Sequence, residues 1–493
     1  MPECIALDAR LSAIADLAHD VLAGEAAPCA ADIGCDHGYL TAHLLERMPR
    51  LTMIASDVSA PSLGKAKRLL EARGLSSRAQ LCVADGLAAL KGPQNVQAVL
   101  IAGMGASTIL RIVEDGRHCI GDAALIVQAN VDLPALRKGL SRLGFGIERE
   151  IFSEAAGRHY VTLMARRGQA RKMGEREALL GAALCGAHEA GQRRYFIWQR
   201  GVRTRELEQM ARLNTDRGRE RMRLSSRDLT WTLEALGMNA CTVADMERLV
   251  GQVAPYELAE EWDNVGLLLG RAGAPVTRAL VALDLTQGVL DEARLLGAQV
   301  IVTHHPIMFS ARKRVTDADR EGRLMLDMAA AGIAHIAAHT NLDCAPGGVN
   351  DALMAALGCR NVRGEGFVRV GDLPQGTTFE GLCERARQRL HADVRGYGPA
   401  ETAVHVLGCC SGAGGGEIAD ARALGADCFI TGEIRHHEAL DAVDGGCCVM
   451  EAGHFETENP VCEVLRSALQ NAADAVQYGI TVFCSKVNPF GRG

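Results

Sequence analysis

Short apolar segments alternate with helix-like segments through the first 160 residues of the chain. Each apolar segment is four to six residues long, which is typical of a strand buried in a sheet. Strands that are separated by single helices run parallel, so this rhythm predicts an α/β fold with a parallel sheet. The predicted strands are Ala30–Ile33, Leu51–Ser56, Ala79–Val83, Ala98–Ile101 and Ala124–Gln128.

The composition is that of a globular protein with several domains. The chain has 493 residues, of which 48% are hydrophobic and 23% are charged, and one core rarely organises so many. No apolar run reaches the roughly 20 residues that span a bilayer, and Glu3 and Asp8 do not fit a signal peptide. The 17 cysteines form no repeated CxxC module. We therefore expect a cytoplasmic protein with reduced thiols and no membrane partner.

A basic segment lies between two acidic blocks. Residues 166–234 carry 16 Lys and Arg against 9 Asp and Glu, whereas the net charge of the whole chain is −7. The segment is rich in Arg, Glu and Leu and nearly free of Pro, which predicts two helices, Lys172–Tyr195 and Val202–Leu236, joined near Gly201. Such a hairpin either contacts a polyanion or presents an ordinary solvated face.

Charged and aromatic residues alternate in the middle of this segment. Arg193, Arg194, Tyr195, Trp198 and Arg200 fall within eight residues of one another. Arginines next to aromatic rings suit phosphate contact and base stacking, and packing of the rings inside the hairpin is the alternative.

A second alternating block begins at about residue 242, where Thr242 is a suitable N-cap. The resulting domains are residues 1–165, a helical hairpin at 166–237, and residues 242–493. The last block contains a weak internal repeat, in which a predicted helix is followed by a predicted strand. The first copy is Leu290–Ala298 followed by Val300–Thr303, and the second is Ile418–Ala426 followed by Cys428–Thr431. This similarity favours two related α/β lobes, with chance likeness of Ala-rich helices as the alternative.

Polar and glycine residues end the successive strands of the first block. The loop from Asp32 to Gly38 follows the first strand, and its spacing is not the GxGxxG of dinucleotide sites. Asp36 would repel a phosphate, whereas the sulfonium and amino groups of S-adenosylmethionine are cationic. Asp57 ends the second strand, where a carboxylate can bind ribose, Asp85 ends the third, and Gly103-Met104-Gly105 ends the fourth. The four strand ends together predict an S-adenosylmethionine site.

These residues resemble the TrmK-type tRNA (adenine-N1)-methyltransferases. The motifs are RLSAIADL from Arg10, ADIGCDHGYL from Ala31, ADGL from Ala84 and IAGMG from Ile101, and the resemblance covers about residues 5–235. It implies a Rossmann-like domain, S-adenosylmethionine as cofactor, tRNA as partner, and methyl transfer to N1 of the adenine at tRNA position 22. The cofactor-binding residues it implies are Asp32, Gly34, Asp36, His37, Asp57, Asp85, Gly86 and Gly103.

Two of these residues are candidates for catalysis. Adenine N1 already carries its lone pair, so no strong base is obligatory, and the methylated ring is cationic. Asp36 is therefore a candidate to stabilise the developing charge. His37 is a competing candidate, and its alternative role is to hold the loop by hydrogen bonds.

Histidines and carboxylates follow three apolar segments of the last block. His304 and His305 follow Val300–Thr303, Asp343 ends the segment Ala338–Asp343, and His454 and Glu458 close the stretch from Glu451. Adjacent residues of an extended chain point to opposite faces, so the histidine pair suits two neighbouring ions. Imidazole and carboxylate together suit zinc, manganese, iron or similar divalent ions.

The last block is similar to the Nif-three-like family, whose members are labelled GTP cyclohydrolase I type 2 homologues. The motifs are EEWDNVGLLLG from Glu260, VTHHP from Val302, HTNLD from His339, GEIRHHE from Gly432 and GHFETE from Gly453. The resemblance implies a two-lobed α/β fold, a dinuclear metal site and ring-like homo-oligomers. The metal ligands it implies are His304, His305, Asp343, His454 and Glu458.

The combined expectation is a fused protein with two chemistries. The first half would be a tRNA adenine methyltransferase, and the second a dinuclear metal module of hydrolase type. Two alternatives stay open: the metal module is non-catalytic and serves assembly, or the methyltransferase acts on another substrate. A purine pocket is not identifiable by spacing, although Glu261–Asn264 could contribute to a substrate mouth.

Overall fold

The computed structural model of the protein describes residues 5–90, 95–168, 170–181, 190–210 and 216–491. The chain divides into two compact units. The first comprises Met1–Arg203 and Arg227–Leu236, and the second comprises Thr204–Ser226 and Gly237–Gly493. The basic segment at 166–237 is therefore shared between the two units.

A seven-stranded sheet forms the centre of the first unit, in the order β3-β2-β1-β4-β5-β7-β6. Strands β1 to β5 run parallel, and β7 pairs antiparallel with β5 and β6. The strand order reverses between β1 and β4, which is where ligands bind in open α/β sheets. The strands are β1 (Cys29–Ile33), β2 (Thr52–Asp57), β3 (Ala79–Val83), β4 (Ala98–Met104), β5 (Ala124–Ala129), β6 (Phe145–Ala155) and β7 (Arg158–Arg167). The predicted Rossmann-like fold is confirmed, and the β6–β7 pair extends it.

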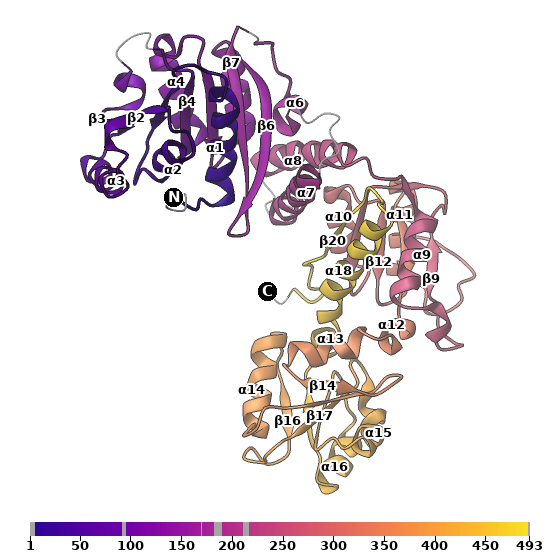
Figure 1. Ribbon diagram of the computed structural model, residues 1–493. Coiled ribbons are helices and arrows are strands. Elements are labelled where there is room, and N and C mark those ends of the chain that lie inside the picture. The colour runs from indigo at the N-terminus through magenta and orange to yellow at the C-terminus, as the bar shows by residue number, and fades with distance from the viewer. Residues whose placement is uncertain (1–4, 91–94, 169, 182–189, 211–215, 492–493) are drawn as a thin grey trace. The chain divides into compact units, whose positions relative to one another are not determined.

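Helices cover both faces of this sheet (Figure 1). Local signals start several of them: Asp8 caps α1, Ser59 caps α3 and Asp132 caps α5, each accepting a hydrogen bond from a backbone amide three residues later. The helices are α1 (Ala9–Leu22), α2 (Tyr39–Arg47), α3 (Ala60–Ala72), η1 (Ser76–Arg78), η2 (Gly86–Ala89), α4 (Ala106–Ile120), α5 (Leu133–Arg142) and α6 (Glu175–Leu180). The central strands β1, β4 and β5 are almost wholly buried, so the core lies along them.

The predicted break in the helical hairpin is wrong. Helix α7 (Ala190–Met210) continues through Gly201, and α8 (Asp216–Ala235) follows it. A glycine inside a helix costs only about 1 kcal/mol relative to alanine, and the flanking Arg, Glu and Leu favour helix. The first predicted helix, Lys172–Tyr195, is also interrupted, because α6 ends at Leu180. Residues 182–189 lie outside the described part of the chain.

The second unit contains two sheets, one for each lobe (Figure 1). The first sheet has the order β20-β11-β12-β13-β9, in which only β9 is antiparallel to its neighbour. Its elements are β9 (Gly266–Leu269), β11 (Arg278–Ala282), β12 (Val300–Thr303), β13 (Ala334–Ala337), β20 (Thr481–Cys484), α9 (Val243–Val253), η4 (Tyr256–Leu258), α10 (Gln287–Leu296), α11 (Arg320–Ala331), α12 (Thr340–Cys344) and α18 (Pro460–Ala475). Thr242 caps α9 through a capping box with Asp245, as predicted.

The second sheet has the order β14-β15-β17-β18-β19-β16. Its elements are α13 (Val349–Ala356), β14 (Arg360–Arg363), β15 (Arg369–Asp372), α14 (Phe379–Leu390), β16 (Arg395–Tyr397), β17 (Val406–Cys409), η5 (Gly414–Glu417), α15 (Ile418–Ala423), β18 (Cys428–Thr431), α16 (His436–Asp444), β19 (Cys448–Glu451) and α17 (His454–Glu458). A short pair, β8 (Cys241–Thr242) and β10 (Pro275–Val276), lies apart from both sheets. The two copies of the predicted repeat form α10 followed by β12, and α15 followed by β18. The two-lobed α/β fold is therefore confirmed.

Two composition-based expectations concern the whole chain. Among the described residues, no helix has the length and apolarity needed to cross a bilayer. The cysteines in the same part of the chain are all free thiols.

Candidate cofactor site and candidate metal centre

The loop after β1 is joined to the end of β2 by hydrogen bonds. The Gly34 amide donates to the Ser56 carbonyl at 2.8 Å. The Asp57 carboxylate accepts from the amides of Asp36 at 3.0 Å and Ser59 at 2.7 Å. Three predicted cofactor residues, Gly34, Asp36 and Asp57, are therefore held at one edge of the sheet.

Gly34 lies where the ends of β1 and β4 approach each other. Its φ is +77°, and a Cβ atom there would lie 2.2 Å from Cε of Met104. Only glycine meets both conditions without strain. The flexible Met104 side chain thus lies directly against the loop that the sequence assigns to the cofactor.

The carboxylates of the first loop lie in contrasting environments. Asp32 is buried and accepts a hydrogen bond from the Thr41 hydroxyl at 2.6 Å, and burial raises its pKa to about 6. Asp36 is exposed, and its φ is +46°. Although partial burial opposes ionisation of Asp36, hydrogen bonds from neighbouring groups, including His37, lower its pKa.

Both ring nitrogens of His37 have partners. Nδ1 lies 2.6 Å from the Asp36 carboxylate, and Nε2 lies 2.9 Å from the Lys65 ammonium. Because an ammonium can only donate, Nε2 accepts and the proton of the neutral ring is on Nδ1. This arrangement leaves His37 no free lone pair and ties the loop to α3.

The remaining predicted residues follow β3 and β4. Asp85 and Gly86 start η2 and, together with Arg111, line a cavity of about 320 Å³. The Gly103 amide donates to the Gln128 side chain at 3.2 Å, and Arg10 donates to the same oxygen at 3.1 Å. Sequence reasoning missed Gln128 and Arg10 as supports of this turn, although Arg10 begins one of the motifs quoted for the family resemblance.

The basic helices show which of the RNA candidates are accessible. Arg193 and Arg194 are exposed, whereas Arg200 is buried. Tyr195 is also buried, and its ring lies 4.6 Å from that of Phe152 and 5.7 Å from that of Trp198. The aromatic residues thus pack inside the fold, which favours the packing alternative for Tyr195.

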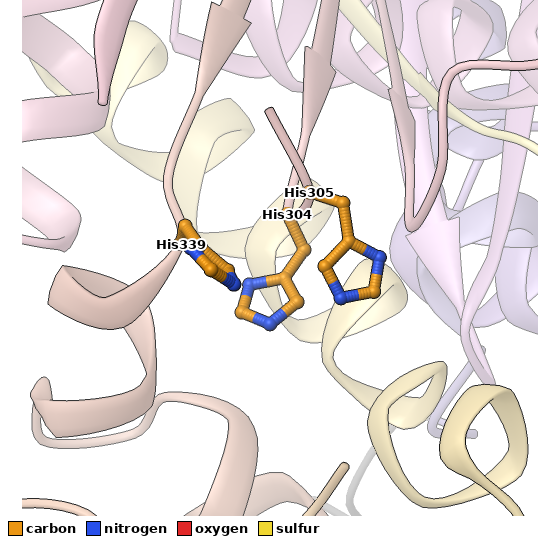
Figure 2. A group of neighbouring side chains, drawn as sticks. All are labelled: His304, His305 and His339. Atoms are coloured by element: carbon orange, nitrogen blue, oxygen red, sulfur yellow. The ribbon is translucent and has the colours of Figure 1, made fainter. Parts of the chain in front are cut away.

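In the second unit, three strand ends converge on one cluster of imidazoles and carboxylates. His304 and His305 follow β12, and His339 follows β13. Figure 2 shows these three rings lying together at the ends of their strands. Helix α17, which follows β19 of the other lobe, brings His454 and Glu458 to the same place.

Glu458 is at the centre of the five predicted metal ligands. Its Oε2 atom lies 3.1 Å from Nε2 of His305 and 3.2 Å from Nε2 of His454. Nε2 of His304 lies 3.9 Å from Oε1 of Glu458 and 3.7 Å from Oδ1 of Asp343. The structure therefore brings all five predicted residues together, although they are far apart in the sequence.

Each imidazole of this cluster is oriented by an acceptor oxygen at Nδ1. The pairs are His304 with the Ala338 carbonyl at 2.9 Å, His305 with Asp284 at 2.8 Å, His339 with Asp263 at 2.8 Å, and His454 with Glu433 at 3.1 Å. Such partners fix the ring orientation and leave Nε2 for a metal ion. This is the arrangement expected around bound metals.

The buried polar atoms of the cluster match a cation. Nε2 of His304 is buried and has no hydrogen bond to the described residues, and Oε2 of Glu458 is buried with only the imidazole nitrogens of His305 and His454 close to it. Burial lowers the pKa of His304 to about 3, so its ring is neutral, and burial with the nearby Glu458 raises the pKa of Asp343. Burial opposes charge on His305, yet Asp284 and Glu458 raise its pKa to about 10. The neutral His304 ring offers a nitrogen lone pair and Glu458 offers carboxylate oxygens, and a bound metal ion would replace the proton on His305.

Two features of the cluster differ from the sequence expectation. His339 is an additional candidate ligand, because its ring nitrogen groups with those of His304 and His305. Its position two residues after a buried strand was the available signal. The rings of His304 and His305 do not point to opposite faces, since their centroids are 4.8 Å apart. The reason is that β12 ends at Thr303, before the pair.

Comparison with known proteins gives two family matches. A model described as Duf34/NIF3 (NGG1p interacting factor 3) matches residues 241–490. A model described as tRNA (adenine(22)-N(1))-methyltransferase matches residues 30–224.

Individual proteins similar to each half are also known. A GTP cyclohydrolase 1 type 2 homolog of Clostridium acetobutylicum is 32% identical over 257 residues, covering 50% of this chain and 96% of that protein. A Staphylococcus aureus crystal structure is 27% identical with a TM-score of 0.50, covering 52% of this chain and 99% of the other. The Bacillus subtilis tRNA methyltransferase TrmK is 23% identical with a TM-score of 0.42, covering 47% of this chain and 99% of the other.

Proposed function

This chain belongs to the Duf34/NIF3 family through residues 241–490, and from this premise we propose how its two halves divide the chemistry. The first half matches the tRNA (adenine(22)-N(1))-methyltransferase model, so the chain is a fusion of a TrmK-type methyltransferase with a GTP cyclohydrolase 1 type 2 homologue. The proposal concerns the substrates, the site residues and the metal ions.

The first half transfers a methyl group from S-adenosylmethionine to N1 of adenine 22 of tRNA. The observation that carries this proposal is the acidic loop held between β1 and β2. Its exposed carboxylate, Asp36, complements a cationic donor, and Asp57 holds the loop in place through the Asp36 amide. S-adenosylmethionine supplies an electrophilic methyl group when it is bound.

The chain's own residues orient and stabilise the reactants. Asp36 offsets the positive charge that develops on the adenine ring. His37 holds the Asp36 side chain, because both of its nitrogens are already engaged. Gly34, Asp85, Gly86 and Gly103 shape the cofactor site, and Asp32 supports the first loop through Thr41.

The test is methyl transfer by the full chain to unmodified tRNA, followed by mapping of the modified nucleoside. We expect 1-methyladenosine at position 22 and none when that adenine is replaced by guanine. D36N should lower the methylation rate, whereas D122N should not, because Asp122 is an exposed acid just before β5, at the opposite edge of the sheet. Methylation at another position would refute the substrate assignment.

The second half binds two divalent ions, such as zinc, manganese or iron, and acts as a hydrolase. The observation that carries this proposal is the set of imidazoles oriented at Nδ1 around the buried Glu458 carboxylate, with the buried Nε2 of His304 lacking a hydrogen bond to the described residues. The ligands are His304, His305, Asp343, His454 and Glu458. A pair of bound ions lowers the pKa of water and polarises the attacked group.

Metal content and hydrolysis test this half separately. The purified chain should hold close to two ions by elemental analysis, and H304A should hold fewer. H405A is the matched control, because His405 is exposed and lies outside the cluster. Hydrolytic activity that persists after chelation would refute the metal role. Metal without turnover of any phosphate or amide substrate would favour the non-catalytic alternative.

Partners and location complete the proposal. The exposed Arg193 and Arg194 contact tRNA, in keeping with the positive charge of residues 166–234. Homo-oligomers form through the second half, as the resemblance implies. The free thiols are in keeping with a cytoplasmic location.

A further inference from the structure

Two large aromatic side chains are exposed beside the metal cluster. Trp262 is 58% exposed and Phe309 is 59% exposed, although such rings carry a large apolar area that folding normally buries. Their centroids are 5.6 Å apart, and each ring lies 6.2 Å from that of His339. The pair therefore forms an apolar surface at the edge of the three imidazoles drawn in Figure 2.

The two loops that carry these rings are held in place. Asn264 donates to the carbonyl of Met308 at 2.6 Å, which joins the loop of Trp262 to the loop of Phe309. Asp263, next to Trp262, has a fully buried side chain that accepts from the amide and hydroxyl of Thr340 and faces His339. The backbone that positions the rings is thus the same backbone that orients a candidate ligand.

Charge distinguishes the two sides of this surface. Phe309 is followed by Arg312, which is paired with Asp319 and Glu321, and by the exposed Lys313 and Arg314. Glu260 and Glu261 precede Trp262. An anionic group is therefore favoured toward the Phe309 loop, and toward the cluster when it holds metal ions, and disfavoured toward the Trp262 loop.

We propose that Trp262 and Phe309 form a stacking platform for the flat heterocyclic ring of a nucleotide, whose phosphate faces the metal cluster and the basic part of the Phe309 loop. Stacking suits any base because every base has a π face, and the cations select an anionic ligand. This inference rests on the proposed metal centre only for the direction of the phosphate. The base comes either from a free nucleotide or from a single strand of RNA.

The experiment is calorimetric titration of the full chain, with and without Zn²⁺, using GMP, AMP and ribose 5-phosphate. Ribose 5-phosphate has the sugar and phosphate but lacks the ring, so we expect it to bind at least 10-fold more weakly. W262A and F309A should each weaken GMP binding by about 10-fold. The affinity of W262F for GMP should stay within about threefold of that of the unchanged chain, because phenylalanine keeps an aromatic face. F490A is the matched control, because Phe490 is 72% exposed elsewhere in the second unit.

The controls separate this inference from the metal proposal. Equal binding of GMP and ribose 5-phosphate, or an unchanged affinity in W262A, would overturn the platform. A change in oligomer mass in W262A without a change in affinity would also overturn it, because the rings would then cover a contact between copies. Nucleotide discrimination without Zn²⁺ supports the platform, whereas failure of the same chain to take up Zn²⁺ refutes the metal centre and leaves the platform standing. A short RNA that binds more tightly than GMP, with the same loss in W262A, supports the platform and identifies RNA as the source.

Discussion

Gly412 offers a sharp test of the metal cluster because it combines backbone strain with a steric conflict. It follows β17, its φ is +59°, and a Cβ atom there would lie 2.3 Å from Oε1 of Glu458 and 3.1 Å from Nε2 of His454. The change G412A therefore pushes a methyl group into two proposed ligands. Gly446 has a φ of +84° and open space around its Cα, so G446A carries the backbone strain alone.

The magnitudes of the two effects differ. Each alanine costs about 1–2 kcal/mol of stability, because L-residues are disfavoured in the left-handed region. In G412A, Glu458 must also move by roughly 1 Å to reach an ordinary contact distance, which breaks its close approach to His305 and His454. Disturbing a ligand or its support typically lowers metal affinity by about 10–100-fold.

The assay is a competition titration of each variant against a metal-binding dye, with thermal unfolding measured in parallel. We expect both variants to lose the stability that the backbone strain costs, G412A to lose more because of its steric conflict, and only G412A to lose metal affinity. If G412A and G446A bind metal equally well, the assignment of Glu458 and His454 as ligands is refuted.

Three further predictions address the rest of the chain. Arg137 and Glu150 form a fully buried bidentate ion pair, so R137M should lower the urea-unfolding free energy of the first unit by about 3–5 kcal/mol. The double change R137M/E150L should recover part of that loss, because the carbonyls of Ala178 and Leu179 still lose their hydrogen bonds from Arg137; equal losses would contradict the reasoning. Burial opposes ionisation of Asp245, but hydrogen bonds lower its pKa from 3.8 to about 2. Because the folded pKa is below the unfolded value, this carboxylate stabilises the fold above about pH 4, and its contribution is lost between about pH 4 and 2. D245N should flatten the dependence of the unfolding free energy on pH in that window and lower this free energy by about 1 kcal/mol at neutral pH. Unfolding followed by circular dichroism measures this, and an unchanged loss of stability between about pH 4 and 2 would count against the prediction. Changing the exposed Arg193 and Arg194 to Gln should weaken tRNA binding and reduce the salt slope by about 2, with S-adenosylmethionine affinity unchanged. A filter-binding series with an unaltered slope would exclude these residues from the RNA contact.

Local patterns predicted the strands and their polar ends correctly. The five apolar segments of the first block became β1 to β5, and Thr242 became an N-cap, because strand periodicity and capping depend on neighbouring residues only. The break at Gly201 was wrong because packing and the surrounding helix formers outweigh one glycine.

Residue chemistry and order along the chain thus determined by themselves the two α/β halves and the ligand types that follow each strand. Only the tertiary structure decided which of those groups meet. Contacts between segments distant in sequence decide that His339 joins the metal cluster and that Arg200 is buried. They also decide that Trp262 and Phe309 are exposed. Periodicity reports which face of one element is apolar, whereas such contacts depend on how the faces of different elements pack together.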